Sequence, residues 1–239
     1  VTLAALVRAA GGEPLDLGVV PDTRHALAAR LRDAVAAGAD LVLTTGGVSV
    51  GEHDHARDAV AALGGALAFW RVRMRPGGPL AAGTLPAADG RGTPGRAVPW
   101  LGLPGNPVST MVTFALLARP LLARLAGDAR PFPRTRAGRL AEAVRTPAPL
   151  VHYLRATVDD AGDDLPHVRL TGAQGSGLLH SMARADALLV VPEHVAALDA
   201  GAAVRLLPLG DDAAYGAAID PGACGLATRD ARADAVRDA

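Results

Sequence analysis

Lysine is absent from this chain of 239 residues: all 24 basic residues are arginine, and 24 acidic residues balance them. A formal net charge of zero argues against a nucleic-acid-binding surface built on excess positive charge. The single cysteine, Cys224, excludes an intramolecular disulfide bond and a cysteine-rich metal site. No uninterrupted apolar run reaches the roughly 20 residues that span a bilayer, so we expect no membrane partner. The sequence opens without a signal-peptide pattern, which favours a cytoplasmic protein.

Half of the residues are hydrophobic, which is enough for a substantial core. The chain begins without methionine and directly in a helical pattern, so we interpret it as a fragment that starts inside a domain. Apolar periodicity separates the first half of the chain into helices and strands. It predicts helices over 2–10, between 23 and 38, over 52–63 and from 108 to a kink or break near Arg119, caused by Pro120. It predicts strands over 15–20, 41–43, 68–75, 80–84 and 97–101.

This alternation predicts an α/β fold for residues 1–130, with a mostly parallel sheet between two layers of helices. The pattern changes after a proline-rich linker, and short strand-like runs over 134–209 predict a small antiparallel β domain resembling a barrel. Residues 210–239 are rich in Ala, Asp and Arg and lack apolar periodicity, so we expect a disordered tail there.

Residues 102–110, Gly-Leu-Pro-Gly-Asn-Pro-Val-Ser-Thr, form the most informative stretch of the chain. The prolines at 104 and 107 fix φ, and the glycine between them permits conformations closed to other residues. Asn106 is a favourable N-cap, and Pro107 suits the first position of a helix. The stretch predicts a stiff loop that opens onto free backbone N–H groups, which is typical of an anion site. A rigid connection is the plainer alternative.

A second glycine-rich turn, Thr-Thr-Gly-Gly-Val-Ser-Val-Gly over 44–51, follows the strand predicted at 41–43. It is neither a dinucleotide-binding fingerprint nor a P-loop, because it has no Gly-x-Gly-x-x-Gly spacing and no lysine. Ligands of α/β proteins bind beyond the carboxyl ends of parallel strands. Together the two turns therefore predict a phosphorylated small-molecule ligand.

Charged residues near these turns have both a plain and a functional interpretation. Asp54 suits the first turn of a helix, where the dipole favours a carboxylate, and it also suits a magnesium site. Arg71, Arg73 and Arg75 would share one face of a strand, as a solvated edge or as a platform for oxyanions. Ser176 lies in a glycine-rich turn that is either a corner of the β domain or part of a ligand site.

Three motifs, over 44–54, 69–77 and 102–109, closely resemble the molybdopterin molybdenumtransferase family, which includes bacterial MoeA and the gephyrin E domain. The resemblance extends to about residue 209. It implies an α/β/α molybdopterin-binding domain followed by a C-terminal β domain. It further implies an enzyme that inserts molybdate into adenylylated molybdopterin and releases AMP, with Mg²⁺ taking part. Family members are homodimers, and other molybdenum-cofactor enzymes are further expected partners.

The resemblance also implies a set of site residues. The implied catalytic residues are Asp54, Asp22, Arg71 and Arg75, of which Asp54 and Asp22 are the metal ligands. The implied molybdopterin-binding residues are Thr45, Gly46, Gly47, Ser49, Pro104, Gly105, Asn106, Pro107 and Ser109. The family often has lysine where Arg75 and Gly78 stand, and a guanidinium group offers an oxyanion a planar fork in place of a point charge.

Two other functions remain open on the sequence alone. One is a CinA-like nucleotide-processing hydrolase on the same α/β module, against which the trailing β domain argues. The other is a non-catalytic module that binds molybdopterin or a peptide, with the β domain as its working surface.

Overall fold

The computed structural model describes residues 2–48, 55–86, 97–147, 149–160 and 164–210, and the backbone of 217–218. These residues divide into two compact units: unit 1 holds Val1–Phe132 and Gly172–Arg184, and unit 2 holds Pro133–Thr171 and Ala185–Ala239. Ser49 and Asp54 lie outside the described residues, as does nearly all of the predicted tail.

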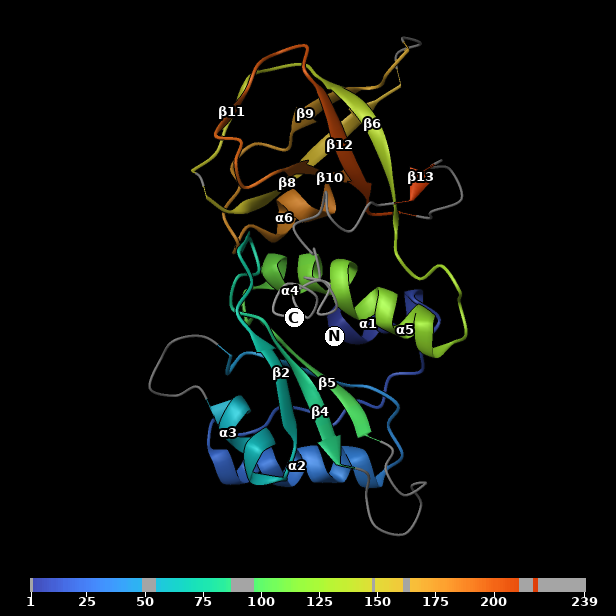
Figure 1. The fold of residues 1–239 in the computed structure, drawn as a ribbon, viewed down its shortest axis with the longest axis vertical. Coiled ribbons are helices and arrows are strands. Elements are labelled where there is room, and N and C mark those ends of the chain that lie inside the picture. Colours follow the sequence, from blue (N-terminus) through green and yellow to red (C-terminus); the bar gives the residue numbers. More distant parts are fainter. Residues whose placement is uncertain are drawn as a thin grey trace, which may run out of the picture. The chain divides into compact units, whose positions relative to one another are not determined.

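Unit 1 alternates helices and strands, as the sequence predicts (Figure 1). Its helices are α1 (Thr2–Ala9), α2 (Arg24–Ala36), α3 (His55–Ala62), α4 (Pro107–Thr113), α5 (Arg119–Leu125) and α6 (Leu179–Ala183), with a π-helix, η1 (Phe114–Ala118), between α4 and α5. Its strands are β1 (Val42–Thr45), β2 (Ala66–Trp70), β3 (Met74–Arg75), β4 (Ala81–Pro86) and β5 (Ala97–Leu103).

Four of these strands form a sheet in the order β1-β5-β4-β2. The β1–β5 pair is parallel, whereas β4 runs antiparallel to both β5 and β2. Strands β1, β2 and β5 therefore point in one direction and β4 in the other. The prediction of a mostly parallel sheet is correct in that three of these four strands point the same way. The pairs of neighbouring strands, however, are one parallel and two antiparallel. The reason is the short connections on both sides of β4, because parallel neighbours need a crossover of a dozen or more residues.

Apolar side chains project from both faces of this sheet and pack against helices on each side, so unit 1 has the predicted three layers. Along β5, Trp100 points into a core with α2 and α3, and the next residue, Leu101, points into a core with α1, η1 and α5. This is the side-chain alternation of a strand that is buried on both faces. Trp70 packs against the first of these cores and is half-buried.

The strand predicted at 15–20 is not present. Leu17 packs against the core, but Leu15 and Val19 are 57 % and 98 % exposed. No described strand pairs with this segment, and the Leu17 carbonyl accepts a hydrogen bond from the Arg30 side chain instead. Gly18 has a φ of 75°, so the segment is not extended throughout, and a strand also needs a neighbour with which to exchange backbone hydrogen bonds.

The strand predicted over 68–75 ends early, at Trp70. Arg71 adopts a φ of 69°, which takes the chain out of the extended region. Its backbone N–H donates to the Leu80 carbonyl at 2.7 Å, so the chain turns back toward β4 at once. The prediction that Arg71, Arg73 and Arg75 share the face of one strand is therefore wrong.

Of the predicted kink or break near Arg119, the break does not occur, because the helix that begins at Pro107 continues to Leu125. The wider π turn of η1 lies directly before Pro120, and the Arg119 N–H donates five residues back to the Phe114 carbonyl. A π turn is a common way to accommodate a proline that lacks an N–H and crowds the preceding turn. The helix is long and apolar enough to cross a membrane, but half of it is buried inside the protein, as in a core helix.

Unit 2 is a small closed barrel, in agreement with the predicted β domain. Its strands are β6 (Arg134–Leu140), β7 (Val144–Arg145), β8 (Val151–Asp159), β9 (His167–Leu170), β10 (Ala187–Val191), β11 (Ala197–Leu198), β12 (Ala203–Pro208) and β13 (Ala217–Ala218). The ring runs β8-β10-β12-β6-β9 and closes on β8. All its pairs are antiparallel except β6–β9. A closed ring with an odd number of strands must contain at least one parallel pair, which explains this departure from the prediction.

Candidate functional site

One row of residues crosses the sheet of unit 1. Trp70 pairs with Ala81, Ala81 with Gly102, and Gly102 with Thr44. Strands β2, β5 and β1 point the same way, so their carboxyl ends all lie at the edge just beyond this row. The structure thereby brings together three segments that the sequence singled out: Arg71 after β2, the turn after β1 and the loop after β5.

The two glycine-containing turns are in direct contact at this edge. The Gly46 N–H donates to the Leu103 carbonyl at 2.9 Å. A Cβ added to Gly105 would lie 3.5 Å from the Gly46 Cα. Gly46 and Gly47 have φ values of 81° and 67°, which favour glycine and curl the turn back over the sheet. The predicted pairing of these two turns is therefore present in the fold.

The loop over 104–107 is braced from within by Thr110. Its hydroxyl lies 2.6 Å from the Pro104 carbonyl and 3.0 Å from the Asn106 carbonyl. Asn106 occupies the N-cap position, as predicted, but its side chain makes no capping hydrogen bond. The stiffness expected from the two prolines thus has a third contributor, which the sequence analysis missed.

A segment from much later in the chain covers the start of α4. The Asn106 Nδ2 donates to the Ser176 hydroxyl at 3.0 Å, and the Val108 N–H donates to the Ser176 carbonyl at 3.2 Å. Residues 172–184 accordingly belong to unit 1, so Ser176 is not only a corner of the β domain. The first turn of α4 is therefore partly occupied, because Pro107 has no N–H group and that of Val108 donates to Ser176.

Other backbone donors at this edge remain open. Within the described residues, the N–H groups of Gly47, Gly105 and Asn106 donate to no other group. Gly105 and Asn106 are exposed, and Thr45 is exposed at the end of β1. Ser109, in contrast, is only 5 % exposed. The open donors at this edge therefore belong to the two turns more than to the first turn of the helix, and the anion site remains a prediction.

Arg71 and Trp70 lie at the opposite end of the same edge. A φ of 69° is uncommon for a residue other than glycine, and such strained positions are concentrated at functional sites. The Trp70 indole N–H donates to the Val48 carbonyl at 3.2 Å, which links β2 to the turn after β1. The guanidinium carbon of Arg71 lies 5.4 Å from the centre of the Trp70 ring.

A third residue, Arg57, joins this group and was missed by the sequence analysis. Its guanidinium carbon lies 3.6 Å from the centre of the Trp70 ring, within the range of a cation–π contact. Arg57 stands in the first turn of α3. A cation is unfavourable at that end of a helix, and this was the one signal in the sequence that could have singled it out.

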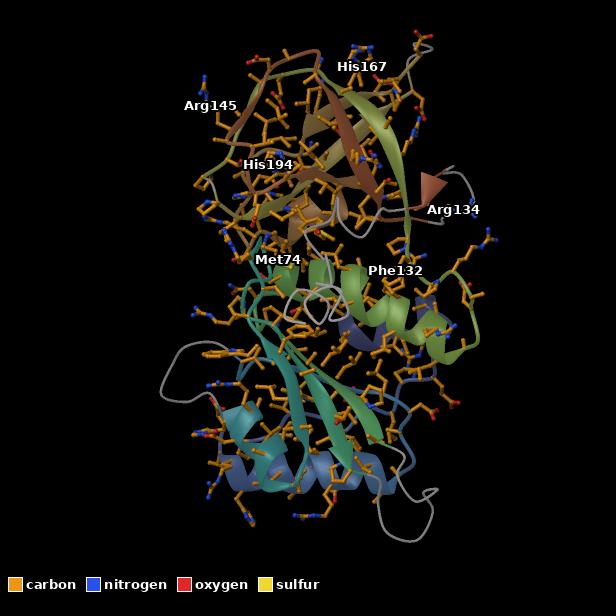
Figure 2. All side chains as sticks on the ribbon, in the orientation of Figure 1. Met74, Phe132, Arg134, Arg145, His167 and His194 are labelled. Atoms are coloured by element: carbon orange, nitrogen blue, oxygen red, sulfur yellow. The ribbon has the colours of Figure 1, made fainter. Side chains whose placement is uncertain are left out.

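Arg75 follows the buried Met74, which Figure 2 labels, in β3, and the turn after this strand packs on Thr113 of α4. A Cβ added to Gly77 would lie 2.5 Å from the Thr113 Cγ2, so only glycine fits there. The turn thus fixes the backbone beside Arg75, whose own side chain is exposed.

Only one of the two predicted metal ligands, Asp22, lies in the part of the chain that the structure describes. Asp22 is exposed just before the N-cap of α2, which is Thr23, and within the described residues its carboxylate has no hydrogen-bond or ion-pair partner. Over the same residues, which exclude Asp54, no three His, Cys, Asp or Glu side chains gather as a metal site. The two expected ligands therefore stay a prediction.

The chain matches two protein families along most of its length. Residues 1–124 match the family described as "Probable molybdopterin binding domain", and residues 137–209 match "MoeA C-terminal region (domain IV)". The two matches fall almost entirely on either side of the linker predicted near residue 131.

Characterised relatives carry corresponding names. A molybdopterin molybdenumtransferase of Nostoc sp. is 33 % identical over 208 residues, covering 87 % of this chain and 46 % of the relative. One from Haemophilus influenzae is 44 % identical over 117 residues, covering 48 % of this chain and 26 % of the relative. Gephyrin of Dictyostelium discoideum is 30 % identical over 81 % of this chain and 29 % of its own length. The chain thus spans less than half the length of these relatives.

Solved structures agree with this likeness. A molybdopterin biosynthesis MoeA protein from Pyrococcus horikosii superposes with a TM-score of 0.67 at 28 % identity, over 88 % of this chain and 47 % of that protein. A molybdenum cofactor biosynthesis protein from Pyrococcus furiosus gives 0.63 at 26 % identity, over 87 % and 62 %.

Proposed function

The chain belongs to the MoeA family of molybdopterin-binding proteins, and on that premise we propose that it forms the molybdopterin-binding part of a molybdopterin molybdenumtransferase. The complete enzyme would insert molybdate into adenylylated molybdopterin and release AMP. The observation that carries the proposal is the contact between the turns at Gly46 and Gly105, which gathers three open backbone N–H groups at one sheet edge.

The size of the edge supports an elongated ligand with two anionic ends. Adjacent strands lie about 4.8 Å apart, so the three spacings between β1 and β2 amount to about 14 Å. Arg71 and the turn at Gly46 are therefore too far apart to hold one phosphate group. We assign the two turns to the phosphate of the pterin or to the diphosphate, and Arg71 to an oxyanion at the other end.

Each proposed residue then has a physical task. The N–H groups of Gly47, Gly105 and Asn106 accept negative charge without a mobile side chain, as backbone anion sites do. The guanidinium groups of Arg71 and Arg75 attract molybdate and balance its charge. Cleavage of the adenylate transfers charge to the departing phosphate, and fixed donors beside it stabilise that charge.

Mg²⁺ belongs to the proposal as well, with Asp54 and Asp22 as carboxylate ligands. Of these, the described residues supply Asp22, whose carboxylate has no protein partner among them. One carboxylate does not by itself make a magnesium site, so the tasks above rest on the protein's own donors. Ser49 and Ser109 remain proposed contacts of molybdopterin. A homodimer, partner enzymes of molybdenum cofactor assembly and a cytoplasmic location also remain predictions.

The experiment is to measure pterin carried by the purified chain. The protein is produced in cells that make molybdopterin, and acid oxidation converts any bound pterin into a fluorescent product. We expect fluorescent pterin in the wild-type chain. Gly105→Val should abolish it, because added methyl groups would fill the approach to Gly46 although the position has ordinary φ.

The matched control is Gly210→Val in unit 2, where an added Cβ meets nothing within 4 Å. It should keep both the pterin and the melting temperature of the wild type. Absence of pterin from the wild-type chain, also after incubation with molybdopterin, would overturn the proposed function. Tight binding of a peptide in its place would favour the non-catalytic module.

A further inference from the structure

Two guanidinium groups lie against one indole ring at the carboxyl edge of the sheet. The guanidinium carbons of Arg57 and Arg71 are 3.6 Å and 5.4 Å from the centre of the Trp70 ring. They are therefore no more than about 9 Å apart, whichever faces of the ring they occupy. Two positive charges are held close together by a neutral side chain.

Trp70 is fixed in place and can serve as a rigid support. Its indole N–H donates to the Val48 carbonyl, and its ring packs against the buried core below α2 and α3. Val48 itself is 1 % exposed and sits at the end of the turn that begins at Gly46. The two arginines are thus tied to the same turn that supplies part of the proposed molybdopterin site.

The charge arrangement is unfavourable for the empty protein. Arg57 stands in the first turn of α3, where the helix dipole is positive, and Arg71 adds a second positive charge. Within the described residues, neither guanidinium group has a carboxylate partner, and the Arg57 Nε is buried without a hydrogen-bond acceptor. A bound anion would compensate both charges.

We propose that Arg57, stacked on Trp70, is a further anion-binding residue that acts with Arg71 on a tetrahedral oxyanion carrying two negative charges. The inference rests on the proposed function, in which such a group is either molybdate or a phosphate of the substrate. Stacking leaves the N–H edge of a guanidinium free in the plane parallel to the ring, where it can bind two oxygens of one anion. Trp70 positions both groups.

The test is calorimetric titration of the full chain with sodium molybdate and, separately, with sodium phosphate. Ionic strength is held constant, at a pH where both anions carry two charges. Arg57→Gln should weaken binding of the preferred anion by about tenfold or more, as expected for the loss of a charge-assisted hydrogen bond. The anion that binds the wild type more tightly identifies the source: molybdate, or a phosphate group.

Arg24→Gln is the matched control, because Arg24 also stands in the first turn of a helix, α2, but is exposed and stacks on no described ring. It should leave both affinities unchanged. An equal loss of anion affinity in the two variants would show that only the overall charge of the protein matters, and would overturn the proposal. Arg57→Lys keeps the charge but loses the planar group that stacks on Trp70. It gives an independent measurement if the glutamine variant does not fold, and an unchanged anion affinity in this variant would also overturn the proposal.

This result is separable from the proposed function. Pterin retention depends on the two turns, not on Arg57. If the chain carries pterin and Arg57→Gln leaves its affinity for both anions unchanged, only the role of Arg57 is refuted. A wild-type chain that carries no pterin refutes the proposed function. A wild-type chain that carries pterin but binds neither free anion refutes the oxyanion site alone.

Discussion

The brace that Thr110 provides to the loop over 104–107 leads to a quantitative prediction. Replacing Thr110 by valine keeps the shape of the side chain and exchanges its hydroxyl for a methyl group. The hydroxyl is the donor that the described structure gives the buried Pro104 carbonyl, at 2.6 Å. Thr110→Val should therefore loosen the loop without emptying space in the core.

The expected loss of unfolding free energy is about 1–2 kcal/mol. A hydrogen bond contributes about 0.5–1.5 kcal/mol net, and a buried acceptor left without a donor costs about 1–3 kcal/mol. Thr110 is only 7 % exposed, so water cannot easily replace the hydroxyl, but the new methyl group gains some burial. For a chain of this size, each kcal/mol corresponds to a fall of about 2–4 °C in Tm.

Thr113→Val is the matched control, one turn further along the same buried helix. The Thr113 hydroxyl bonds to the Ser109 and Thr110 carbonyls at 2.8 and 3.1 Å. Both carbonyls also have helical N–H donors, which the valine variant retains. Its stability should change by less than about 0.5 kcal/mol, since hydroxyl bonds back to the preceding turn add little.

The assay combines chemical denaturation with pterin retention for the two variants. Thr110→Val should lose stability and release pterin more readily, whereas Thr113→Val should resemble the wild type in both measurements. Equal destabilisation by the two substitutions would refute the reasoning. So would a Thr110→Val protein that is less stable but retains pterin as well as the wild type, because the brace would then have no connection to the site.

Three further predictions concern the same edge. Gly102→Ala should lower Tm strongly, since the new Cβ would lie 2.5 Å from the Val48 Cγ1, and thermal melts check this. A double-mutant cycle of Asn106→Ala and Ser176→Ala should give a coupling free energy of about 0.5–1.5 kcal/mol in denaturation, the range of one hydrogen bond; additive losses would deny the contact. In the longer parent enzyme, Asp54→Asn should change the unfolding free energy by at most about 1 kcal/mol and strongly reduce release of AMP, because asparagine lacks the charge that Mg²⁺ requires; equal AMP release would remove Asp54 from the site.

Much of the fold could be predicted because its signals are local. The helix over 24–36 follows from its apolar stripe and the cap at Thr23, whose hydroxyl accepts the Ala26 N–H. The turn at Gly46 and the loop at Gly105 follow from residues that restrict or free φ. That these two turns meet also follows, because neighbouring parallel strands end at one edge of a sheet.

The failed predictions all depended on a neighbour that the local sequence does not contain. The segment at 15–20 has the alternation of a strand but no described partner strand. The alternation over 68–75 ignored Arg71, whose left-handed backbone is held by the Leu80 carbonyl nine residues later. That Ser176, which lies 68 residues beyond Val108 in the sequence, accepts the Val108 N–H could not be predicted locally either.

The sequence by itself determined the periodicity of helices and strands, the change to a β domain near residue 131 and the two turns that suit an anion. Each of these depends on backbone preferences and on apolar spacing within about a dozen residues. Only the tertiary structure decided that Arg57 stacks on Trp70 and that Ser176 covers α4. Such contacts join segments whose meeting depends on the packing of the whole unit, so no local pattern encodes them.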